Sequence, residues 1–462
     1  MKTIRELFAK PVDRKIEEVI KVDQFEEQTV RSEFQEYIVT DSIREHFRTV
    51  YDEIIEVSRN PREGIGVWVS GFFGSGKSSF VKILGYTIAS RAVCGQSSSE
   101  IFKKHVKDTR TSGLLDVINR TLPTHAVIFD VSMDRGVRFK SDRMSEIMYN
   151  ALLRELGYAE DFDLAELEIT LEGDGRLDEF CKLFEEAYGK PWKIRRKVGL
   201  GINEASAVLN KLDPRTYPSA DSYAKSLGEK GRADITPNKL AERAFDLAER
   251  RMRGKALIFI IDEVGQYVSR SIDKMLDLQA VVQAFGKVGY NRVKQKKATA
   301  PFWIVVTSQE KLNEVVDALD SKKIELARLQ DRFRITIDLK QTDISEITGR
   351  RVLEKNEKGV AALEKLFDDN EGRLKTFCTL ERTSRNVIMN KRDFVNLYPY
   401  LPYQIDLCID IVAGLRLKRG AHRHIGGSNR TIIKQAQEMM INPRTMVDEA
   451  PTGTLDNPRQ SI

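Results

Sequence analysis

The glycines, lysine and serines between positions 71 and 79 have the types and the spacing that bind nucleotide phosphates. The run GFFGSGKS, residues 71–78, fits the pattern G-x-x-x-x-G-K-[ST] at every fixed position. Glycines allow backbone N–H groups to turn toward phosphate oxygens, and the N-terminus of a following helix adds partial positive charge. The alternative is an ordinary glycine turn that opens a helix. The candidate residues for binding ATP are Gly71, Phe72, Phe73, Gly74, Ser75, Gly76, Lys77, Ser78 and Ser79.

Four side chains together supply the groups that hydrolysis of a nucleotide requires. We expect Lys77 to reach the β- and γ-phosphates and the Ser78 hydroxyl to ligate Mg²⁺. The apolar run 256–261 is followed by Asp262, which would hold the Mg²⁺ shell, and by Glu263, which would polarise the attacking water. The alternative for this acidic pair is a core strand that ends in solvated acids.

A third polar position follows the acidic pair along the chain. The apolar run 301–306 ends in Thr307 and Ser308. A hydroxyl at the end of this strand could orient the same water molecule, although many strands end in serine or threonine. Thr307 and Ser308 are therefore further candidates for the catalytic set.

Strands and helices must bring these residues together. Residues 66–70 predict a buried strand before the glycines, and residues 79–92 predict an amphipathic helix after them. This order of strand, glycine loop and helix is the context that the phosphate-binding motif requires. The apolar runs 256–261 and 301–306 predict two more strands of a parallel sheet, and residues 124–134 contain a further core strand.

The chain between Lys77 and Asp262 is longer than a compact nucleotide-binding core needs. It covers 262 − 77 = 185 positions, which is about twice what ordinary connections between elements require. Residues at about 135–235 include the helical stretches MSEIMYNALLREL and RLDEFCKLFEEAYG, and they end in a run with Pro, Gly and Ser. We expect a helical insertion there, which contacts a partner or a neighbouring subunit or decorates the surface.

The composition is that of a helix-rich protein without a membrane partner. The 462 residues are 41% hydrophobic and 31% charged, and no run approaches the ~20 apolar residues of a membrane helix. The cysteines are far apart, which argues against a zinc site and disulfides and predicts a reducing, cytoplasmic location. The net charge of +6, from 75 basic and 69 acidic residues, permits contact with nucleic acid without predicting it. The four cysteines are Cys94, Cys181, Cys378 and Cys408.

Three basic runs are candidates for contact with double-stranded DNA. They are KIRRKVG (193–199), NRVKQKKA (291–298) and RLKRGAHRH (416–424). Each is also consistent with a solvated charged face, and affinity that falls steeply with salt would distinguish contact with nucleic acid.

The ordered motifs, followed by arginines at 328–334 and a helical remainder, resemble the AAA+ ATPases. Within them, the initiator-like branch that includes origin-recognition ATPases is most similar. The segments MKTIRELFAKPVDRKIEEVIKVDQ, EYIVTDSIREHFRTVYD and GVWVSGFFGSGKSSFVKILGY resemble more closely the start of the BrxC family, the P-loop ATPases of bacterial BREX bacteriophage-exclusion systems. The similarity continues through IIDEVGQYV and VVTSQEKL. Because BrxC proteins are much longer, the resemblance implies that this chain is their N-terminal ATPase portion.

The resemblance implies an α/β fold, an AAA+ P-loop NTPase core with a parallel sheet and flanking helices, and a C-terminal helical lid. The expected boundaries are an N-terminal helical extension at 1–60, a nucleotide-binding domain at 61–340 that contains the insertion, a lid at 341–442 and a flexible tail at 443–462. It implies ATP and Mg²⁺ as cofactors. It also implies self-association into a homo-oligomer, partnership with other BREX defence subunits, and double-stranded DNA as a further partner.

The same resemblance implies roles for several arginines. In ring-forming ATPases an arginine after the polar strand end enters the neighbour's site and neutralises charge in the transition state. Arg328, Arg332 and Arg334 are the candidates. Arg430 is in the first turn of the last expected helix, where the family has a lid arginine that senses the γ-phosphate. The alternative for each is a solvated surface arginine.

These observations predict an Mg²⁺-dependent ATPase whose cycle assembles or remodels a defence complex on DNA. One alternative is an ATP-switched scaffold with little turnover, in which nucleotide sets oligomerisation. A second alternative is an ATPase of the replication initiator or loader type. A GTPase is disfavoured because no N-K-x-D follows the acidic strand, and the signature LSGGQ of ABC-type ATPases is absent before it.

Overall fold

The computed structural model describes most of the chain. The described residues are 3–14, 20–71, 74–131, 143–197, 201–227, 234–268, 271–317, 329–340, 343–377, 389–405, 407–408, 411 and 429–441. Within these ranges, no helix combines the length and the apolar character needed to cross a bilayer.

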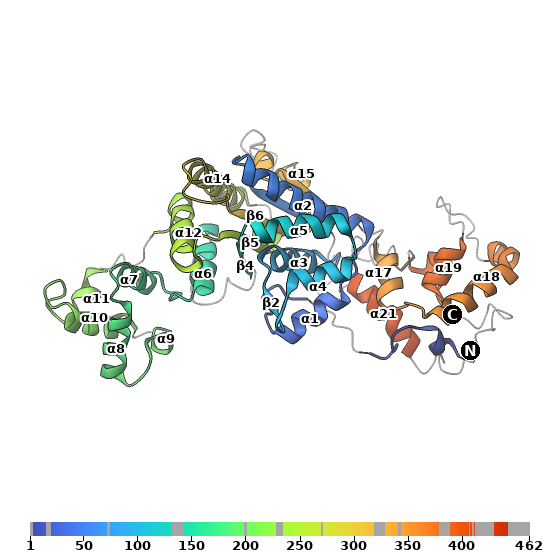
Figure 1. The fold of residues 1–462 in the computed structure, drawn as a ribbon, viewed down its shortest axis with the longest axis horizontal. Coiled ribbons are helices and arrows are strands. Elements are labelled where there is room, and N and C mark those ends of the chain that lie inside the picture. The colour runs from blue at the N-terminus through green and yellow to red at the C-terminus, as the bar shows by residue number, and fades with distance from the viewer. Residues whose placement is uncertain are drawn as a thin grey trace.

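A five-stranded parallel sheet forms the centre of the molecule (Figure 1). Its strand order is β4-β5-β6-β1-β7, and every residue of β1, β5 and β6 is buried. Near-continuous apolar runs form such strands because helices cover both faces of a parallel sheet. The predicted α/β class and parallel sheet are therefore confirmed. The strands are β1 (Gly66–Gly71), β4 (Thr124–Asp130), β5 (Ala256–Asp262), β6 (Trp303–Ser308) and β7 (Ile335–Leu339).

The direction in which strands are added to the sheet reverses at β1. From β1 the chain crosses to β4 at the far edge, returns through β5 to β6, and then passes over β1 to β7. Ligands bind outside the carboxyl ends of parallel strands at such a reversal of direction. The carboxyl ends of β1, β5 and β6 carry the predicted phosphate loop, acidic pair and hydroxyl residues.

Helices from both sides of the sheet complete the main core. Helix α3 (Lys77–Ala89) packs against β1, β4, β5 and β6, and α2 (Asp41–Arg59) packs on α5 (Thr109–Thr121). Buried side chains of α2, including Phe47 and Tyr51, belong to the same hydrophobic core as the sheet. The other elements around this core are α1 (Glu27–Glu36), β2 (Ala92–Val93), β3 (Gln96–Ser97), α4 (Ser98–Val106), α6 (Met144–Leu156), α12 (Pro237–Met252), α13 (Val264–Val268), α14 (Ile272–Lys294) and α15 (Leu312–Asp317).

A separate helical unit lies beyond α6 and α12 (Figure 1). Its own core contains Phe180, Phe184 and Trp192, whose rings contact one another. Helix α6 lies within the range expected for the insertion, yet it contacts β4, α12 and α14 of the central domain. The elements of the separate unit are α7 (Phe162–Gly173), α8 (Leu177–Tyr188), α9 (Trp192–Arg195), α10 (Gly201–Leu212) and α11 (Ser222–Ser226).

A second helical unit combines the C-terminal helices with the N-terminal segment. Its core contains Leu7 and Phe8 together with Leu353, Phe367 and other apolar residues of the C-terminal helices. The backbone N–H of Ala9 donates to the Glu354 carbonyl at 2.7 Å, so a hydrogen bond also joins the N-terminal segment to the chain just after α17. The elements of this unit are η1 (Ile4–Leu7), α17 (Asp343–Arg351), α18 (Glu357–Phe377), α19 (Lys391–Leu397) and α21 (Asn429–Ile441).

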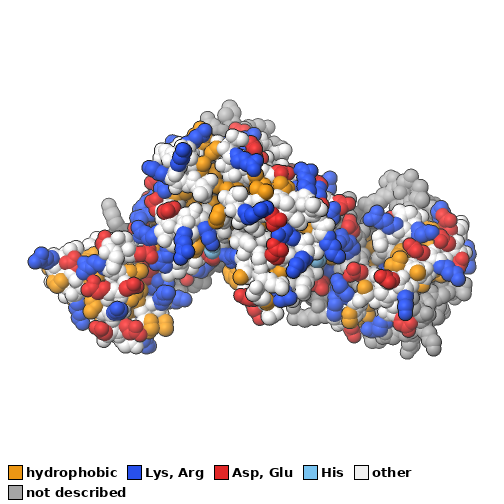
Figure 2. Space-filling model, viewed as in Figure 1, with side chains coloured by type: hydrophobic (Ala, Val, Ile, Leu, Met, Phe, Trp, Pro, Cys, Tyr) orange, Lys and Arg blue, Asp and Glu red, His pale blue; other side chains and the backbone are white. Residues whose placement is uncertain are grey.

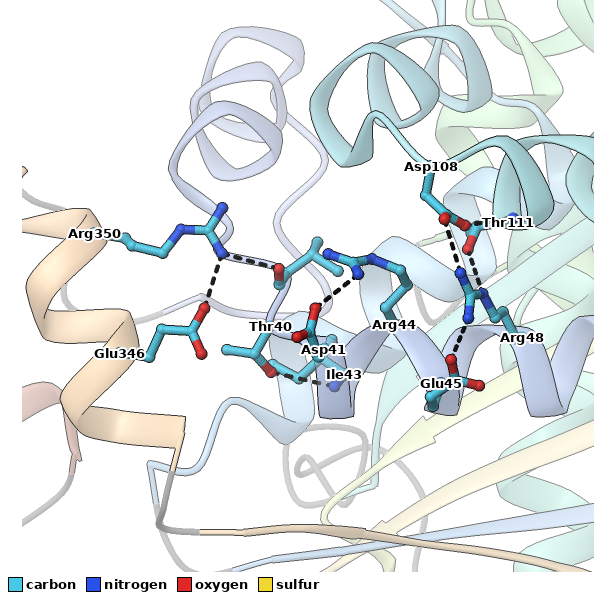
Figure 3. Close-up of polar contacts among 11 residues, drawn as sticks. Thr40, Asp41, Ile43, Arg44, Glu45, Arg48, Asp108, Thr111, Glu346 and Arg350 are labelled. Atoms are coloured by element: carbon cyan, nitrogen blue, oxygen red, sulfur yellow. Dashed lines mark hydrogen bonds and ion pairs between the residues drawn. The ribbon is translucent and has the colours of Figure 1, made fainter. Parts of the chain in front are cut away.

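Polar contacts join this C-terminal unit to the central domain through the start of α2 (Figure 3). Arg350 of α17 donates to the Val39 carbonyl at 3.1 Å and also pairs with Glu346. Thr40 then caps α2, because its hydroxyl accepts the Ile43 N–H at 3.2 Å. The C-terminal unit therefore contacts the residue next to the cap of a core helix.

The same helix is fixed to α5 further along its length (Figure 3). Arg48 of α2 donates to Asp108 at 2.7 Å and to the Thr111 hydroxyl at 3.2 Å. The Arg48 guanidinium and the Thr111 groups hold the pKa of the Asp108 carboxyl well below its usual range. Asp108 also caps α5 by accepting the Thr111 N–H, so one carboxylate positions two helices.

Candidate functional site

The glycine loop connects the end of β1 to the start of α3. Gly74 and Gly76 have φ values of +81° and +90°, which favour glycine because a Cβ strains this conformation. A Cβ on Gly71 would lie 2.5 Å from the Ser75 hydroxyl oxygen and 3.0 Å from the Leu339 carbonyl oxygen. The loop therefore folds tightly over the carboxyl end of the sheet. Phe72 and Phe73, also predicted to bind ATP, lie outside the described residues.

Lys77 is the first residue of α3 and is buried within the loop. Its side-chain ammonium donates to the Gly71 carbonyl at 2.7 Å, and the residue is only 6% exposed. Ser78 and Ser79 follow in the same first turn, Ser78 half-buried and Ser79 buried. Backbone N–H groups at the start of a helix are without intrahelical acceptors, so this turn presents donors beside the Lys77 charge.

The Ser75 hydroxyl is an independent sign of a ligand in this loop. Its oxygen is buried and has no hydrogen-bond partner among the described residues. A buried hydroxyl without a partner costs about 1–3 kcal/mol, and a phosphate oxygen would accept a hydrogen bond from it. The loop therefore fits a phosphate group both in its backbone conformation and in its unused donor.

Asp262 and Thr307 face one another across the neighbouring strands β5 and β6. The Thr307 hydroxyl donates to the Asp262 carboxylate at 2.5 Å and accepts the Glu263 backbone N–H at 2.9 Å. Asp262 is 4% exposed and Thr307 is fully buried. One hydroxyl therefore fixes the orientation of the first carboxylate and the backbone of the second.

Glu263 has an unusual backbone and a shifted acidity. Its φ of +59° is rare for a residue other than glycine, and its carboxylate accepts from the Gln266 amide at 2.7 Å. Burial and the neighbouring Asp262 charge raise the pKa of the Glu263 carboxyl above its ordinary value, while the Lys77 charge opposes this shift. The electrostatic coupling indicates that Glu263 and Lys77 belong to one site.

Asp130 is a site residue that the sequence reasoning missed. It ends β4 and is aligned in register with Asp262 of β5. Its negative charge also raises the pKa of the Glu263 carboxyl. The sequence contained the signal, because Asp130 follows an apolar run just as Asp262 does, but the neighbouring position of the two strands was unknown.

Thr307 and Ser308 have different partners, although both end β6. The Ser308 hydroxyl accepts the Glu310 backbone N–H at 3.1 Å, and a Cβ on Gly265 would lie 2.5 Å from its oxygen. Successive side chains of a strand point to opposite faces, so only one of the two can meet Asp262. The structure brings Thr307 to the acidic pair and directs Ser308 toward α13.

A further polar contact lies beside the loop and was also missed. Ser70, the residue before Gly71, donates to the Asp338 carboxylate at 3.3 Å and to the Ile337 carbonyl at 3.0 Å. Lys311 pairs with the other oxygen of Asp338 at 2.9 Å. These contacts hold the end of β7 and the segment after β6 next to the start of the loop.

Arg332 and Arg334 lie at the amino ends of the strands, whereas Lys77 lies at the carboxyl ends. Both precede β7, and in a parallel sheet the amino end of β7 adjoins the amino end of β1. Arg332 pairs with Glu63 at 2.8 Å, and the Arg334 side chain lies against Gly64. The structure therefore does not bring either arginine to the phosphate loop of its own chain.

Arg328 lies outside the described residues, and Arg430 is in the first turn of α21.

The residues at the loop also fit a magnesium ion that is bound together with phosphates. No group of three or more His, Cys, Asp or Glu side chains in the described residues could hold a metal by itself. Mg²⁺ is commonly bound by one or two carboxylates together with substrate phosphates. Ser78 and Asp262 are a hydroxyl and a carboxylate of this kind, at the ends of the loop and of β5.

The described geometry thus unites Lys77, Asp262, Glu263 and Thr307, adds Asp130, and separates Arg332 and Arg334 from them. No protein-family model matches the chain.

Proposed function

We propose that the protein is an Mg²⁺-dependent ATPase whose site lies between the glycine loop and the acidic pair. The observation that carries this proposal is the single hydroxyl of Thr307, which holds Asp262 and the backbone of Glu263 within electrostatic reach of Lys77. A purely structural glycine turn would not account for the unpartnered Ser75 hydroxyl or for a buried lysine whose charge acts on the Glu263 carboxyl.

Each residue of the site then has a role in the reaction. The loop N–H groups, the Ser75 hydroxyl and Lys77 bind the phosphates, and Asp262 and Ser78 hold the metal. When it is bound, Mg²⁺ neutralises charge that develops on the phosphate oxygens. Glu263 accepts a proton from the attacking water, and its raised pKa brings it closer to the value that suits a general base near neutral pH.

We further propose that the site is completed by a second copy of the chain, as in AAA+ ATPases. Arg332 and Arg334 lie at the amino ends of the strands, and their own phosphate loop lies at the carboxyl ends. A role in catalysis would therefore place them at another subunit's nucleotide. A head-to-tail interface of this kind closes into a ring or extends as a filament. Arg430 of the C-terminal helices is the proposed γ-phosphate sensor.

The biological setting is proposed from sequence resemblance. The segments that resemble the BrxC family assign the chain to the ATPase portion of a BREX phage-defence component. There it would use ATP-controlled oligomerisation to assemble or remodel a complex with other defence subunits on DNA. The helical unit of α7–α11 has its own core, which supports a role as an attached interaction module.

An ATP-switched scaffold is the second candidate, and one contact favours it. Arg332 is engaged by Glu63 within its own chain, so this arginine must be released before it can act on a neighbour's nucleotide. Turnover would then stay low until neighbours assemble. Both candidates share the same nucleotide site and differ in the rate of hydrolysis.

The direct test of nucleotide binding uses Lys77→Ala. We expect this variant to lose most affinity for ATP and nearly all phosphate release, because Lys77 is the cation of the loop. The matched control is Lys104→Ala, which removes an exposed lysine of α4. Equal ATP affinity for Lys77→Ala and the wild type in a fluorescence titration would contradict the proposed site.

A further inference from the structure

We propose that a cluster of cations at the amino edge of the sheet binds the phosphate backbone of double-stranded nucleic acid. Most of these cations lie in two turns, one between α12 and β5 and one at the end of α14. We call this cluster the amino-edge basic surface. Its members are Arg253, Lys255, Lys287, Lys294, Lys296 and Lys297.

The two turns are adjacent in space although they are far apart in the sequence. Lys255 and Lys297 line the same small pocket, whose wall includes Phe245 and Phe302. The two phenylalanine rings are stacked with centroids 3.7 Å apart, which holds α12 against the segment before β6. Lys287 extends the surface along α14. It lies seven positions before Lys294, and residues at this spacing share one face of a helix.

The positive charge of this surface is only partly compensated by neighbouring acids. All six cations are exposed, and none forms an ion pair within the described part of the chain. Asp246, an acid nearby on α12, is paired with Arg292 at 2.7 Å. Glu249 lines the same pocket as Lys255. Six positive charges with so little compensation attract a polyanion, and the attraction is weakened by salt.

The chemistry of the surface favours a phosphate backbone over other polyanions. Lysines act as flexible point charges that contact phosphates without reading sequence. Single-strand binders present aromatic rings for base stacking, whereas Phe245 and Phe302 are buried. The half-buried ring of Tyr290 is already contacted by Lys294, whose ammonium lies 5.6 Å from the ring centroid. Protein partners are typically held by exposed aromatic and arginine anchors, and the surface has only Arg253. A duplex therefore matches the surface better than a single strand or an acidic protein segment.

The basic surface is separate from the proposed nucleotide site. Lys255 precedes β5, whereas Asp262 is its last residue, so the two sites lie at opposite ends of the same strand. Figure 2 shows Lys and Arg side chains along the side of the central domain where α12 and α14 lie. Duplex binding at this surface does not depend on ATP hydrolysis, and it is measured without nucleotide.

The test measures duplex affinity as a function of salt concentration. Fluorescence anisotropy with a labelled duplex of random sequence, about 30 base pairs long, covers the range from about 50 to 200 mM salt in which counterion release is steep. The test variant is Lys294→Gln/Lys296→Gln/Lys297→Gln. Because each phosphate contact contributes about 0.9 to the slope of log affinity against log salt, the variant is expected to reduce the slope by about 2 to 3.

The matched control removes the same charge from exposed lysines outside the three basic runs. Lys182→Gln/Lys190→Gln/Lys211→Gln changes three exposed lysines of the unit formed by α7–α11, and its slope is expected to equal that of the wild type. Unchanged thermal unfolding and ATP affinity in the test variant show that it is folded.

Three results would overturn the inference. The first is that the wild-type protein does not bind the duplex at the lowest salt concentration. The second is that both triple variants lose affinity equally, because binding would then follow total charge and not this surface. The third is that polyglutamate binds more tightly than the duplex, which would assign the surface to an acidic protein partner.

Discussion

Thr307 and Asp262 are joined by a hydrogen bond of 2.5 Å between neighbouring strands, and the same threonine oxygen accepts the Glu263 N–H. The hydroxyl thereby connects the proposed metal ligand to the proposed general base. Since the carboxylate is buried, the loss of this donor would leave it with an unsatisfied acceptor, which is costly. Thr307 is therefore the residue on which the geometry of the acidic pair most depends.

Removing this hydroxyl should lower the rate of ATP hydrolysis while leaving nucleotide binding largely intact. For Thr307→Ala we expect kcat to fall by about 10- to 100-fold, as when a group that orients a metal ligand is removed. Thr307→Ser keeps the hydroxyl and should retain most activity. Phosphate release measured at saturating ATP distinguishes the two variants.

Ser308→Ala is the matched control for this prediction, because Ser308 ends the same strand but faces Glu310 and Gly265. Its activity should be close to that of the wild type. If Ser308→Ala were more damaging than Thr307→Ala, the assignment of Thr307 to the acidic pair would be wrong.

The location of Arg332 and Arg334 predicts activity in mixtures of two inactive variants. Arg334→Ala lacks the arginine given to a neighbour, whereas Glu263→Gln lacks the base of its own site. In a mixed oligomer, some interfaces combine an intact Glu263 with an intact Arg334. Because an arginine supplied by a neighbour raises hydrolysis by about 10³-fold or more, the mixture should release phosphate faster than the mean of the two variants.

The same mixing experiment with Arg332→Ala distinguishes the two arginines. Glu63 pairs with Arg332, so Glu63→Gln should increase activity if Arg332 is the acting residue and have little effect if Arg334 is. Mixtures whose rates equal the mean of their components for both arginines would argue against a shared site.

Two glycines of α18 predict opposite effects of the same substitution. Replacing a helical glycine by alanine usually stabilises a helix by about 0.5–1 kcal/mol. A Cβ on Gly372 would meet open space, so Gly372→Ala should stabilise the protein. A Cβ on Gly359 would lie 2.4 Å from the Leu7 carbonyl oxygen, so Gly359→Ala should destabilise it and displace the N-terminal segment.

Chemical unfolding and hydrogen exchange of the segment 3–14 measure this difference. The pairing of Asn356 with the backbone of the same segment, including the Leu7 carbonyl at 2.9 Å, predicts a loss of protection there in Gly359→Ala alone. Equal stability of the two alanine variants would mean that the N-terminal segment does not pack on α18 in solution.

The local part of the site could be predicted from the sequence because its residues are close together along the chain. The glycine loop needs glycines at fixed spacing before a helix, and Asp262 and Glu263 follow an apolar run that can only be a buried strand. The strand, the loop and the helix follow one another directly, so their order can be predicted from a single segment of the sequence. Its chemistry therefore follows from residue types and spacing.

The other features of the site and the fold depend on which distant segments become neighbours. Asp130 joins the site only because β4 pairs with β5 in register. The choice of Thr307 over Ser308 depends on which face of β6 meets Asp262, and the residue types are too similar to decide it. The packing of Leu7 and Phe8 among the C-terminal helices joins residues that are separated by most of the sequence, and no local pattern encodes such a contact.

The measurement that tests the central claim most directly compares phosphate release and ATP binding in Glu263→Gln. This change keeps the size of the side chain and removes its basicity. Since a general base contributes about 10²- to 10⁴-fold, hydrolysis should fall by that factor while ATP affinity stays within about twofold of the wild type. An unchanged rate of phosphate release in Glu263→Gln would contradict the proposed ATPase site.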